Sequence, residues 1–470
     1  MSDARCDLAV LGAGPAGAAA ALEAASLGLS VVLLDEARDA GGQVFRAPTH
    51  GAAEEAEGDT LRAALAASSV DCRFARRVWT LEPGFRIAAL GPDGSERIEA
   101  ATLIVATGAV ERHIPTPGWT LPGVFGLAAA TILLKAERVL PGRRVVVAGT
   151  GPLLYLVAAK ILAGGGTVAA VVDARPRGAW LAAAGALAAR PDLAARGLGW
   201  MARLGAARVP ILAGHAVTMI EGDATVSRVT VAPLAADGTP RGDGVRSFDV
   251  DSLCLGYGLV PATEATRLLG ARHAFDAARG GWLAETDAMQ ATSLPGVFAC
   301  GDGAGLAGAA AAPLSGRIAA IGAGRHLGRI AENDAAARVE PLRVAHDRAA
   351  RFGRAMTALA TPPAGLLALM TAETMLCRCE AVTRATASAA IAGGARTLGD
   401  LKAATRCGMG PCGGRLCGEA AAMLLAHDTR QDRAAIGPAT ARPPLRPVPL
   451  AALAGAFRYE DLPIPEPAPL

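Results

Sequence analysis

Residues 7–36 read DLAVLGAGPAGAAAALEAASLGLSVVLLDE, and this stretch decides the fold class. A short apolar run leads into the glycine-rich turn GAGPAG at residues 12–17, an alanine-rich stretch of helical composition follows, and a second apolar run ends in two acidic residues. This order of strand, glycine turn, helix, strand and acid predicts a dinucleotide-binding βαβ unit in an α/β protein. The residues that we expect at the nucleotide are Gly12, Gly14, Pro15, Ala16, Gly17, Asp35 and, as the alternative to Asp35, Glu36.

Each glycine of this turn has a physical reason. Gly12 permits the tight turn, Gly14 lets the backbone approach a pyrophosphate, and Gly17 lets the helix pack close to the strand. The free N–H groups at the start of the helix attract the phosphates. Asp35 follows the second strand, where a carboxylate accepts hydrogen bonds from ribose hydroxyls. A glycine-rich turn in another kind of α/β domain is the alternative.

The composition excludes several classes of protein. The chain has 470 residues, of which 52% are hydrophobic and 19% charged, so it is too apolar to be disordered. With 46 basic and 43 acidic residues, its charge gives no reason to expect a nucleic-acid partner. The first residues lack the basic region of a signal peptide, and Gly, Pro or charged residues interrupt the long apolar runs. We therefore expect no transmembrane segment and a cytoplasmic location, with peripheral attachment to the inner face of the cell membrane as the variant.

Two later segments resemble the FAD-binding pattern of the glutathione reductase-like flavoproteins, which contain two dinucleotide-binding domains. They are LIVATG at residues 103–108 and GVFACGD at residues 296–302. The resemblance implies that Asp302 holds the ribityl chain and that the loop Gly41-Gly42-Gln43 lies near the isoalloxazine ring. Arg46 is a candidate to face the flavin or a substrate carboxylate, with an ordinary loop arginine as the alternative. The additional cofactor-binding residues implied are Gly42, Gln43, Arg46, Ala106, Thr107, Gly108, Gly301 and Asp302.

The disulfide reductases of that group carry a redox cysteine pair beside the flavin, and this chain departs from them. The first four cysteines are isolated in or beside apolar runs: Cys6, Cys72, Cys254 and Cys300. We interpret them as small buried hydrophobic residues, so thiol–disulfide chemistry is disfavoured.

A second unit at residues 144–173 repeats the pattern of strand, glycine turn, helix and strand. Leu154 replaces the third glycine, and Asp173 would favour a ribose 2′-hydroxyl over a 2′-phosphate, although Arg175 and Arg177 complicate that preference. This unit is typical of an inserted NAD(P)-like domain. We leave three occupants open: NAD, another nucleotide such as ATP, or nothing.

Five cysteines fall within 41 residues near the C-terminus: Cys377, Cys379, Cys407, Cys412 and Cys417. Thiolates at this density favour zinc, Cu(I) or iron–sulfur centres. Structural zinc usually uses C-x(2–4)-C pairs, which Cys377-Arg-Cys379 does not fit. Its spacing resembles the opening of the bacterioferritin-associated-ferredoxin-like (BFD-like) [2Fe–2S] domain. The predicted ligands are Cys377, Cys379, Cys412 and Cys417, with Cys407 as an alternative or neighbouring thiol; a zinc site or free thiols remain the other interpretation.

The combination resembles one narrow family over nearly the whole chain, the large subunit of the bacterial flavin-dependent amine dehydrogenases. This group includes opine oxidases, hydrogen cyanide synthase and the hydroxyproline or proline dehydrogenases. The strings that carry the resemblance are GWTLPGV at 118–124, VAGTGPLL at 147–154, residues 405–417 and RPPLRPVP at 442–449. The resemblance implies two partners, a beta subunit of glycine/sarcosine oxidase-like type and a small, ferredoxin-like gamma subunit.

The function expected from this resemblance is that of the FAD- and [2Fe–2S]-containing subunit of a heteromeric dehydrogenase. Its substrate would be an amino acid or an amino-acid-derived secondary amine: an opine, proline, hydroxyproline or glycine. No residue of the sequence stands out as the catalytic base. A self-sufficient NAD(P)H-dependent flavin oxidoreductase and a nucleotide-binding scaffold subunit without its own turnover are the alternatives.

The predicted fold class is that of a two-dinucleotide-binding-domain α/β flavoprotein with a small helical [2Fe–2S] domain. The predicted domains are an FAD-binding domain (1–115 and 288–340), an inserted NAD(P)-like domain (116–287), a connector (341–372), a BFD-like domain (373–430) and a Pro-rich C-terminal arm (431–470). Their boundaries are the softest part of the prediction.

Overall fold

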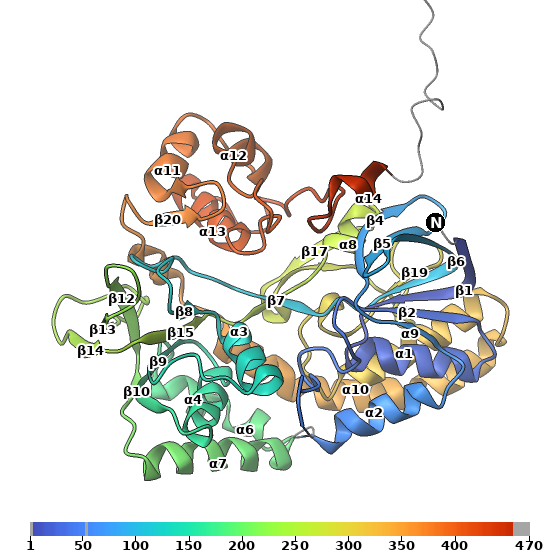
Figure 1. Cartoon of the computed structure of the whole chain (residues 1–470), viewed down its shortest axis with the longest axis horizontal. Coiled ribbons are helices and arrows are strands. Elements are labelled where there is room, and N and C mark those ends of the chain that lie inside the picture. Colours follow the sequence, from blue (N-terminus) through green and yellow to red (C-terminus); the bar gives the residue numbers. More distant parts are fainter. Residues whose placement is uncertain (1–2, 52–54, 455–470) are drawn as a thin grey trace, which may run out of the picture.

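The structure is a computed structural model that describes residues 3–51 and 55–454. Its largest sheet has seven strands in the order β3-β2-β1-β6-β5-β4, and β19 also pairs with β6 (Figure 1). The strands are β1 (Asp3–Leu11), β2 (Val31–Leu34), β3 (Asp71–Arg73), β4 (Arg77–Glu82), β5 (Arg86–Gly91), β6 (Gly94–Val105) and β19 (Val297–Ala299). The strands that pair in parallel are β1, β2, β3, β6 and β19. An antiparallel meander is formed by β4, β5 and β6.

Helices α1 (Pro15–Ser26) and α9 (Ala312–His326) lie side by side against this sheet, and α2 (Ala56–Ala66) lies nearby. Helices α1 and α9 lie in close contact because both are built from small residues. A Cβ added at Gly316 would lie 2.0 Å from the carbonyl oxygen of Ala16. The side chains of these two helices and of β1 and β2 form one buried core. This packing holds the first glycine turn against the segment that follows β19.

The second sheet contains five parallel strands in the order β11-β10-β9-β15-β8. Alternate residues of β9 face opposite sides, as a strand requires. Val145 and Val147 pack with α3 and α4, whereas Val146 and Ala148 pack with an antiparallel three-stranded sheet, β12-β13-β14. The elements are β8 (Val124–Phe125), α3 (Leu127–Ile132), a π-helical turn (Leu133–Glu137), β9 (Arg144–Gly149), α4 (Leu153–Ala163), β10 (Thr167–Asp173), α5 (Arg177–Ala182), α6 (Ala184–Leu187), α7 (Pro191–Ala206), β11 (Ile211–Ala213), β12 (His215–Glu221), β13 (Arg228–Pro233), β14 (Arg246–Asp249) and β15 (Ser252–Gly256).

Short antiparallel pairs join the two halves. Strand β7 (Ala109–Glu111) pairs with β16 (Leu259–Pro261), so the chain enters and leaves the second unit side by side. Helix α8 (Glu264–Leu268), the hairpin β17 (His273–Asp276) and β18 (Gly281–Ala284), and 3₁₀ turns at Ala277–Arg279 and Gly301–Ala304 complete this region.

Helix α10 (Glu332–Ala360) packs along α9 and runs on to the second unit. The domain boundary that we predict at residue 340 does not coincide with a break in the structure, because residue 340 lies inside this helix. Pro341 removes one backbone N–H, yet the helix continues through it, since the flanking sequence is rich in Ala, Arg and Glu.

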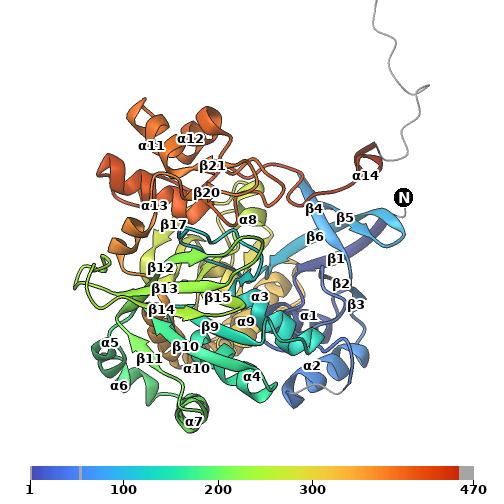
Figure 2. The same ribbon diagram turned by 60° about the vertical axis from the view of Figure 1, so that its left-hand side comes forward.

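The C-terminal unit has its own core, built around buried leucines, alanines and three cysteines. Its elements are a 3₁₀ turn (Ala364–Leu369), β20 (Met375–Cys377), β21 (Val382–Thr383), α11 (Arg384–Ala392), α12 (Leu398–Thr405) and α13 (Gly418–Thr429). Figure 2 shows this unit at the opposite end of the molecule from α7.

The Pro-rich segment after α13 returns to the first unit. The backbone N–H of Leu445 donates to the Trp79 carbonyl of β4 at 2.7 Å, and Arg446 forms an ion pair with Glu264 of α8. Helix α14 (Leu450–Ala454) follows, and the remainder of the predicted arm, residues 455–470, lies outside the described residues. Within the described ranges, no helix has both the length and the apolar character needed to cross a bilayer.

Candidate functional site

The first glycine turn has the geometry of a pyrophosphate cradle. Gly12 has φ +103°, and a Cβ there would lie 2.4 Å from the Ala106 carbonyl oxygen. A Cβ at Gly17 would lie 1.8 Å from the Gly12 carbonyl oxygen, which explains the close helix–strand packing. At Gly14, by contrast, the nearest atom to an added Cβ is Gly42 Cα at 3.9 Å. The turn is therefore closed where the chain packs and open where a phosphate would approach.

The carboxylate of Asp35 lies directly beside this turn. It accepts hydrogen bonds from the backbone N–H groups of Ala13 at 2.6 Å and Ala37 at 2.7 Å. Burial raises the pKa of Asp35 above its ordinary value, and these hydrogen bonds oppose the shift. Glu36 is exposed and turned toward Arg446 at 3.7 Å. The geometry thus favours Asp35 over Glu36 at a ribose.

The predicted isoalloxazine loop packs on the same turn. The Gly41 N–H donates to the Ala13 carbonyl at 2.9 Å, and a Cβ at Gly42 would lie 2.9 Å from Gly14 Cα. Arg46 donates from Nε to Gln43 Oε1 at 3.1 Å, and its positive charge opposes part of the rise that burial causes in the pKa of Asp35. The structure therefore brings this loop and the acid together.

Two further predicted segments complete the cradle. Ala106 contacts Gly12, and Gly301 lies against Ala16, where an added Cβ would come within 2.7 Å of the alanine methyl. The Thr107 hydroxyl donates to the Ala262 carbonyl at 2.7 Å, and Gly108 lies beside the 3₁₀ turn that contains Asp302. Three separate strand ends, those of β1, β6 and β19, thus meet at one edge of the sheet, as parallel strands do at a nucleotide site.

Asp302 is held by backbone donors at this edge. One carboxylate oxygen accepts from Ala307 N at 3.1 Å and from Gly308 N at 3.2 Å, and burial raises the pKa of this carboxyl. The same oxygen, Oδ1, takes both of these bonds, so Oδ2 receives none of them. A carboxylate that lines a pocket at this place fits a hydroxyl-bearing chain such as ribityl.

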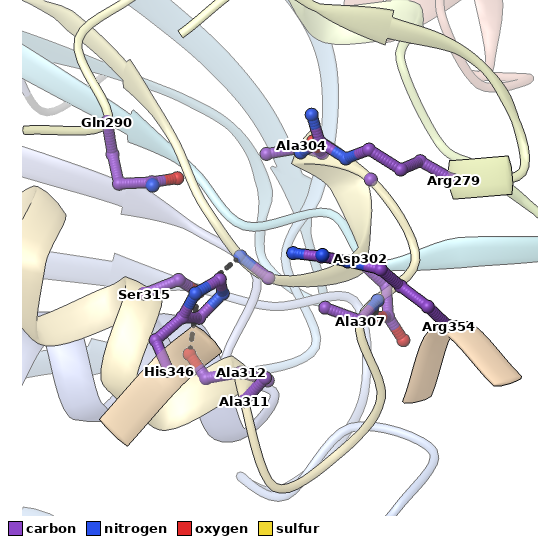
Figure 3. A pocket seen from close by; sticks show the side chains of 12 residues that line it. Arg279, Gln290, Asp302, Ala304, Ala307, Ala311, Ala312, Ser315, His346 and Arg354 are labelled. Carbon is purple, nitrogen blue, oxygen red and sulfur yellow. Dashed lines mark hydrogen bonds between the residues drawn. The ribbon is translucent and has the colours of Figure 1, made fainter. Parts of the chain in front are cut away.

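A small pocket, partly open to solvent, lies beside the Asp302 loop (Figure 3). Arg279 enters it from the turn after β17, and His346 and Arg354 enter it from α10. The Arg279 guanidinium donates to the Ala304 carbonyl at 2.7 Å. Because basic side chains outnumber the single carboxyl of Asp302 here, the pocket favours anionic groups.

The second glycine turn differs from the first. A Cβ added at Gly151 would lie 2.7 Å from the side chain of Ala360, the last residue of α10, and the Thr150 hydroxyl donates to the Ala360 carbonyl at 2.6 Å. The phosphate of a bound dinucleotide occupies the side of this glycine where a Cβ would stand. The end of α10 therefore covers the position that a pyrophosphate would need.

The acid of the second unit is also engaged. Asp173 is fully buried and accepts from the Tyr155 hydroxyl at 2.8 Å, Trp180 Nε1 at 3.0 Å and the Arg175 N–H at 2.9 Å. Unlike Asp35, its donors include two side chains, so no ribose reaches it without displacing them. These residues do not fit NAD or ATP in the usual position, so of the three occupants left open above the contacts favour the third, a unit without a nucleotide.

Three of the five C-terminal cysteines form one close group, and it includes Cys407, which the sequence predicts only as the alternative ligand. The Sγ atoms of Cys377, Cys407 and Cys417 all lie within 4.8 Å of one another, and all three residues are buried. Cys379 and Cys412 are both half-buried, and the neighbouring Cys412 thiol contributes to the raised pKa of Cys379. The glycine-rich loop wraps the second pair closely, because a Cβ at Gly410 would lie 2.2 Å from Cys379 Cβ. This donor set fits an iron–sulfur cluster, which takes thiolates as ligands.

Two functional features escaped the sequence reasoning. Trp119 donates from Nε1 to the Met375 carbonyl at 2.7 Å, stacks with His113 at 6.3 Å between ring centres, and lies under the guanidinium of Arg378 at 5.9 Å. The sequence did offer one signal for Trp119, because this residue lies in the string at 118–124 that carries the family resemblance. Ala360, which covers the second glycine turn, carries no such signal, because an alanine at the end of a helix is unremarkable in sequence.

Of the four isolated cysteines, Cys254 and Cys300 are buried as predicted, whereas Cys6 and Cys72 are half-buried. Burial raises the pKa of Cys300 to about 12 and that of Cys6 to about 11, which makes both poor nucleophiles. All nine cysteines are free thiols.

Comparison with known families shows to which family the chain belongs. The model of the pyridine nucleotide-disulphide oxidoreductase family matches residues 6–324, and that of the BFD-like [2Fe-2S] binding domain matches residues 375–427. The chain belongs to the pyridine nucleotide-disulphide oxidoreductase family. As a member of this family it is a flavin oxidoreductase with FAD as cofactor, and its C-terminal domain is of the [2Fe–2S] type, which confirms both predicted cofactors and the fold class.

Within this oxidoreductase family the chain has relatives of similar length. It is 35% identical to the A subunit of opine oxidase from Agrobacterium tumefaciens, over 95% of this chain and 91% of the relative. It is also 35% identical to hydrogen cyanide synthase subunit HcnB of Pseudomonas aeruginosa, over 94% and 97%. The predicted family resemblance is confirmed. The solved structure of L-proline dehydrogenase from P. horikoshii shares the fold, with a TM-score of 0.71, 20% identity, and coverage of 97% of this chain and 81% of that one.

Proposed function

We propose that this chain is the electron-relaying subunit of a heteromeric dehydrogenase that oxidises an amino acid or an amino-acid-derived secondary amine. The proposal fits the relatives, which are named as subunits of opine oxidase and hydrogen cyanide synthase. The single observation that carries it is the joining of two candidate redox sites by one stretch of chain. The loop at Thr107 lies at the flavin cradle, and Trp119, twelve residues later, holds the carbonyl of Met375 beside the cysteine cluster.

Two redox groups of different capacity suit this role. FAD accepts a hydride equivalent of two electrons, whereas a [2Fe–2S] cluster passes one electron at a time. This chain supplies the geometry: the open side of Gly14 for the pyrophosphate, Asp35 for the ribose and Asp302 for the ribityl chain. The remaining proposed flavin contacts are Pro15, Ala16, Gly42, Gln43, Arg46, Ala106, Thr107, Gly108 and Gly301.

For the cluster we propose one ligand pair for each iron. Cys377 and Cys417 lie in the group of thiols within 4.8 Å, and the Cys379 thiol is influenced most by its neighbour Cys412 among the other cysteines. This arrangement gives two close pairs, as two tetrahedral irons bridged by sulfide require.

We propose that amine oxidation takes place with a beta subunit of glycine/sarcosine oxidase-like type, and that a small ferredoxin-like subunit takes part too. The opine oxidase and cyanide synthase relatives bear subunit names, which supports a complex for this chain as well. The substrate class proposed is an opine, proline, hydroxyproline or glycine.

We also propose a cytoplasmic location with peripheral attachment to the inner face of the cell membrane. Residues 175–208 contain six arginines and one acidic residue. In this segment Leu181, Leu198 and Met201 are exposed by 76%, 71% and 40%. Apolar side chains beside a surplus of arginine suit an anionic lipid surface, and α7 lies at an outer edge of the molecule in both views (Figure 2).

The test is purification without air, followed by measurement of FAD, iron, acid-labile sulfide and zinc. We expect a yellow-brown protein that contains FAD, iron and sulfide, and whose flavin is reduced slowly by amines unless the beta subunit is added. Colourless protein, or zinc in place of iron and sulfide, would overturn the electron-relay role. The self-sufficient NAD(P)H reductase is the second candidate, and the covered glycine turn at Gly151 argues against it.

A further inference from the structure

The cysteine cluster holds one thiol more than a [2Fe–2S] centre binds. Such a centre takes four protein ligands, and residues 377–417 supply five thiols. The fifth, Cys407, is no distant surface residue: it is 6% exposed, and its Sγ lies within 4.8 Å of the Sγ atoms of both Cys377 and Cys417.

The five thiols fall into two unequal groups. The first contains Cys377, Cys407 and Cys417, whose Sγ atoms all lie within 4.8 Å of one another. The second contains Cys379 and Cys412, which lie outside that group and whose thiols influence each other's ionisation. Cys407 is therefore adjacent to one end of the ligand set only.

The backbone around Cys407 holds the thiol at this place. Arg406, which ends α12, has φ +65° and turns the chain sharply toward the cluster, and its guanidinium pairs with Glu380 at 2.7 Å. The Cys407 N–H donates to the Thr405 hydroxyl at 3.2 Å. The next residue, Gly408, donates its N–H to the Cys377 sulfur. These contacts order the loop from both sides of Cys407.

From this arrangement we propose that Cys407 is a reserve ligand for the iron that Cys377 and Cys417 bind. It can replace either of these two cysteines and cannot replace Cys379 or Cys412. The proposal rests on the ligand pairs given above. In the exchange, the bond from iron to the sulfur of Cys417 breaks, a bond to the sulfur of Cys407 forms, and the proton of the Cys407 thiol passes to the released thiolate. No electron is transferred in this step.

The test compares single and double variants of the full chain, purified without air and reconstituted with iron and sulfide. The readouts are iron and sulfide per chain and the electron paramagnetic resonance (EPR) spectrum after reduction by dithionite. We expect C407A to keep the cluster content and spectrum of the parent. We expect C417A and C377A to retain most of the cluster with a shifted spectrum, and C379A and C412A to lose it. The double variant C407A/C417A should lose it as well.

The outcomes separate the alternatives. Loss of the cluster in C407A would make Cys407 a primary ligand, and loss in C417A to the same degree as in C412A would remove the reserve role; either result overturns the proposal. The FAD content of each variant reports whether the rest of the chain has folded, and a Ser variant at each position repeats the measurement with a smaller change in volume. Absence of iron and sulfide from the parent chain would instead overturn the proposed function.

Discussion

The indole of Trp119 donates a hydrogen bond to the carbonyl of Met375, two residues before Cys377. Trp119 belongs to the segment that leaves the flavin cradle, and Met375 belongs to the strand that enters the cysteine cluster. The same indole stacks on His113, whose pKa burial lowers to about 4, so this histidine is neutral at physiological pH. One aromatic side chain thus fixes the cluster domain against the chain that joins the two redox sites.

We expect Trp119→Phe to weaken this docking, because it removes the N–H donor and leaves the half-buried Met375 carbonyl without this partner. Such a loss costs about 1–3 kcal/mol. Heating the variant should bleach the iron–sulfide absorption at a lower temperature than in the parent. Trp282→Phe is the matched control, since its indole N–H has no hydrogen-bond partner in the structure, and it should leave that temperature nearly unchanged. Equal shifts in both variants would contradict a specific role for the Trp119 donor.

The two acids at the end of β2 are predicted to differ. Asp35→Ala should lower the affinity for FAD by about tenfold or more, because a hydrogen bond to a charged group is worth about 1.5–3 kcal/mol. Glu36→Ala should leave the affinity unchanged, since its carboxylate is exposed and turned away. Titration of the apoprotein with FAD, followed by flavin fluorescence, measures both. A larger loss for the Glu36 variant would reverse the assignment.

NADH should fail to bleach the flavin rapidly under anaerobic conditions. The carbonyl of Ala360 already accepts a hydrogen bond from the Thr150 hydroxyl over the second glycine turn. Asp173 already accepts hydrogen bonds from three donors of the chain. Stopped-flow mixing with NADH tests this, and dithionite serves as the positive control for a reducible flavin. Bleaching within the mixing time would show that the end of α10 moves aside.

Much of this site could be predicted because its chemistry depends on local sequence. The open side of Gly14, the positive φ of Gly12 and the buried place of Gly17 follow from a turn that only glycine can form. The spacing of the cysteines likewise limits which kinds of metal centre can bind there. The fold class follows from the same strand and helix order.

The rest depends on contacts between segments far apart in sequence, which no local pattern encodes. Asp173 and Asp35 occupy equivalent places after their strands, and only the packing of Tyr155 and Trp180 makes one of them unavailable. The closure by Ala360 comes from a residue more than two hundred positions after Thr150. The predicted domain boundary at residue 340 falls inside α10, because Pro341 does not end this helix.

Glu111 should make stability depend on pH. This buried carboxyl accepts from the N–H groups of Leu127 and Ala128, and burial raises its pKa to about 7. The folded state therefore binds a proton that the unfolded state releases at lower pH, so the stabilisation is present at low pH and is lost as pH rises through about 7. The difference amounts to about 3 kcal/mol. Glu111→Gln should abolish this part of the dependence between pH 5 and 8, as followed by thermal unfolding, whereas the exposed control Glu82→Gln should not.

Replacement of the exposed apolar side chains of α5 and α7 should release the protein from anionic lipid. Leu198 and Met201 are three residues apart and share one face of α7, Arg196 and Arg203 are seven apart and share another, and Leu204 packs inward. We expect the parent chain to float with vesicles of phosphatidylglycerol and phosphatidylcholine, less so at high salt, and the triple variant Leu181→Ser/Leu198→Ser/Met201→Ser to remain behind. Val344→Ser, an equally exposed apolar site on α10, is the control and should float like the parent. If the parent chain does not bind these vesicles, and the triple variant no longer binds the beta subunit, the exposed side chains of α5 and α7 bind protein. The membrane proposal then fails.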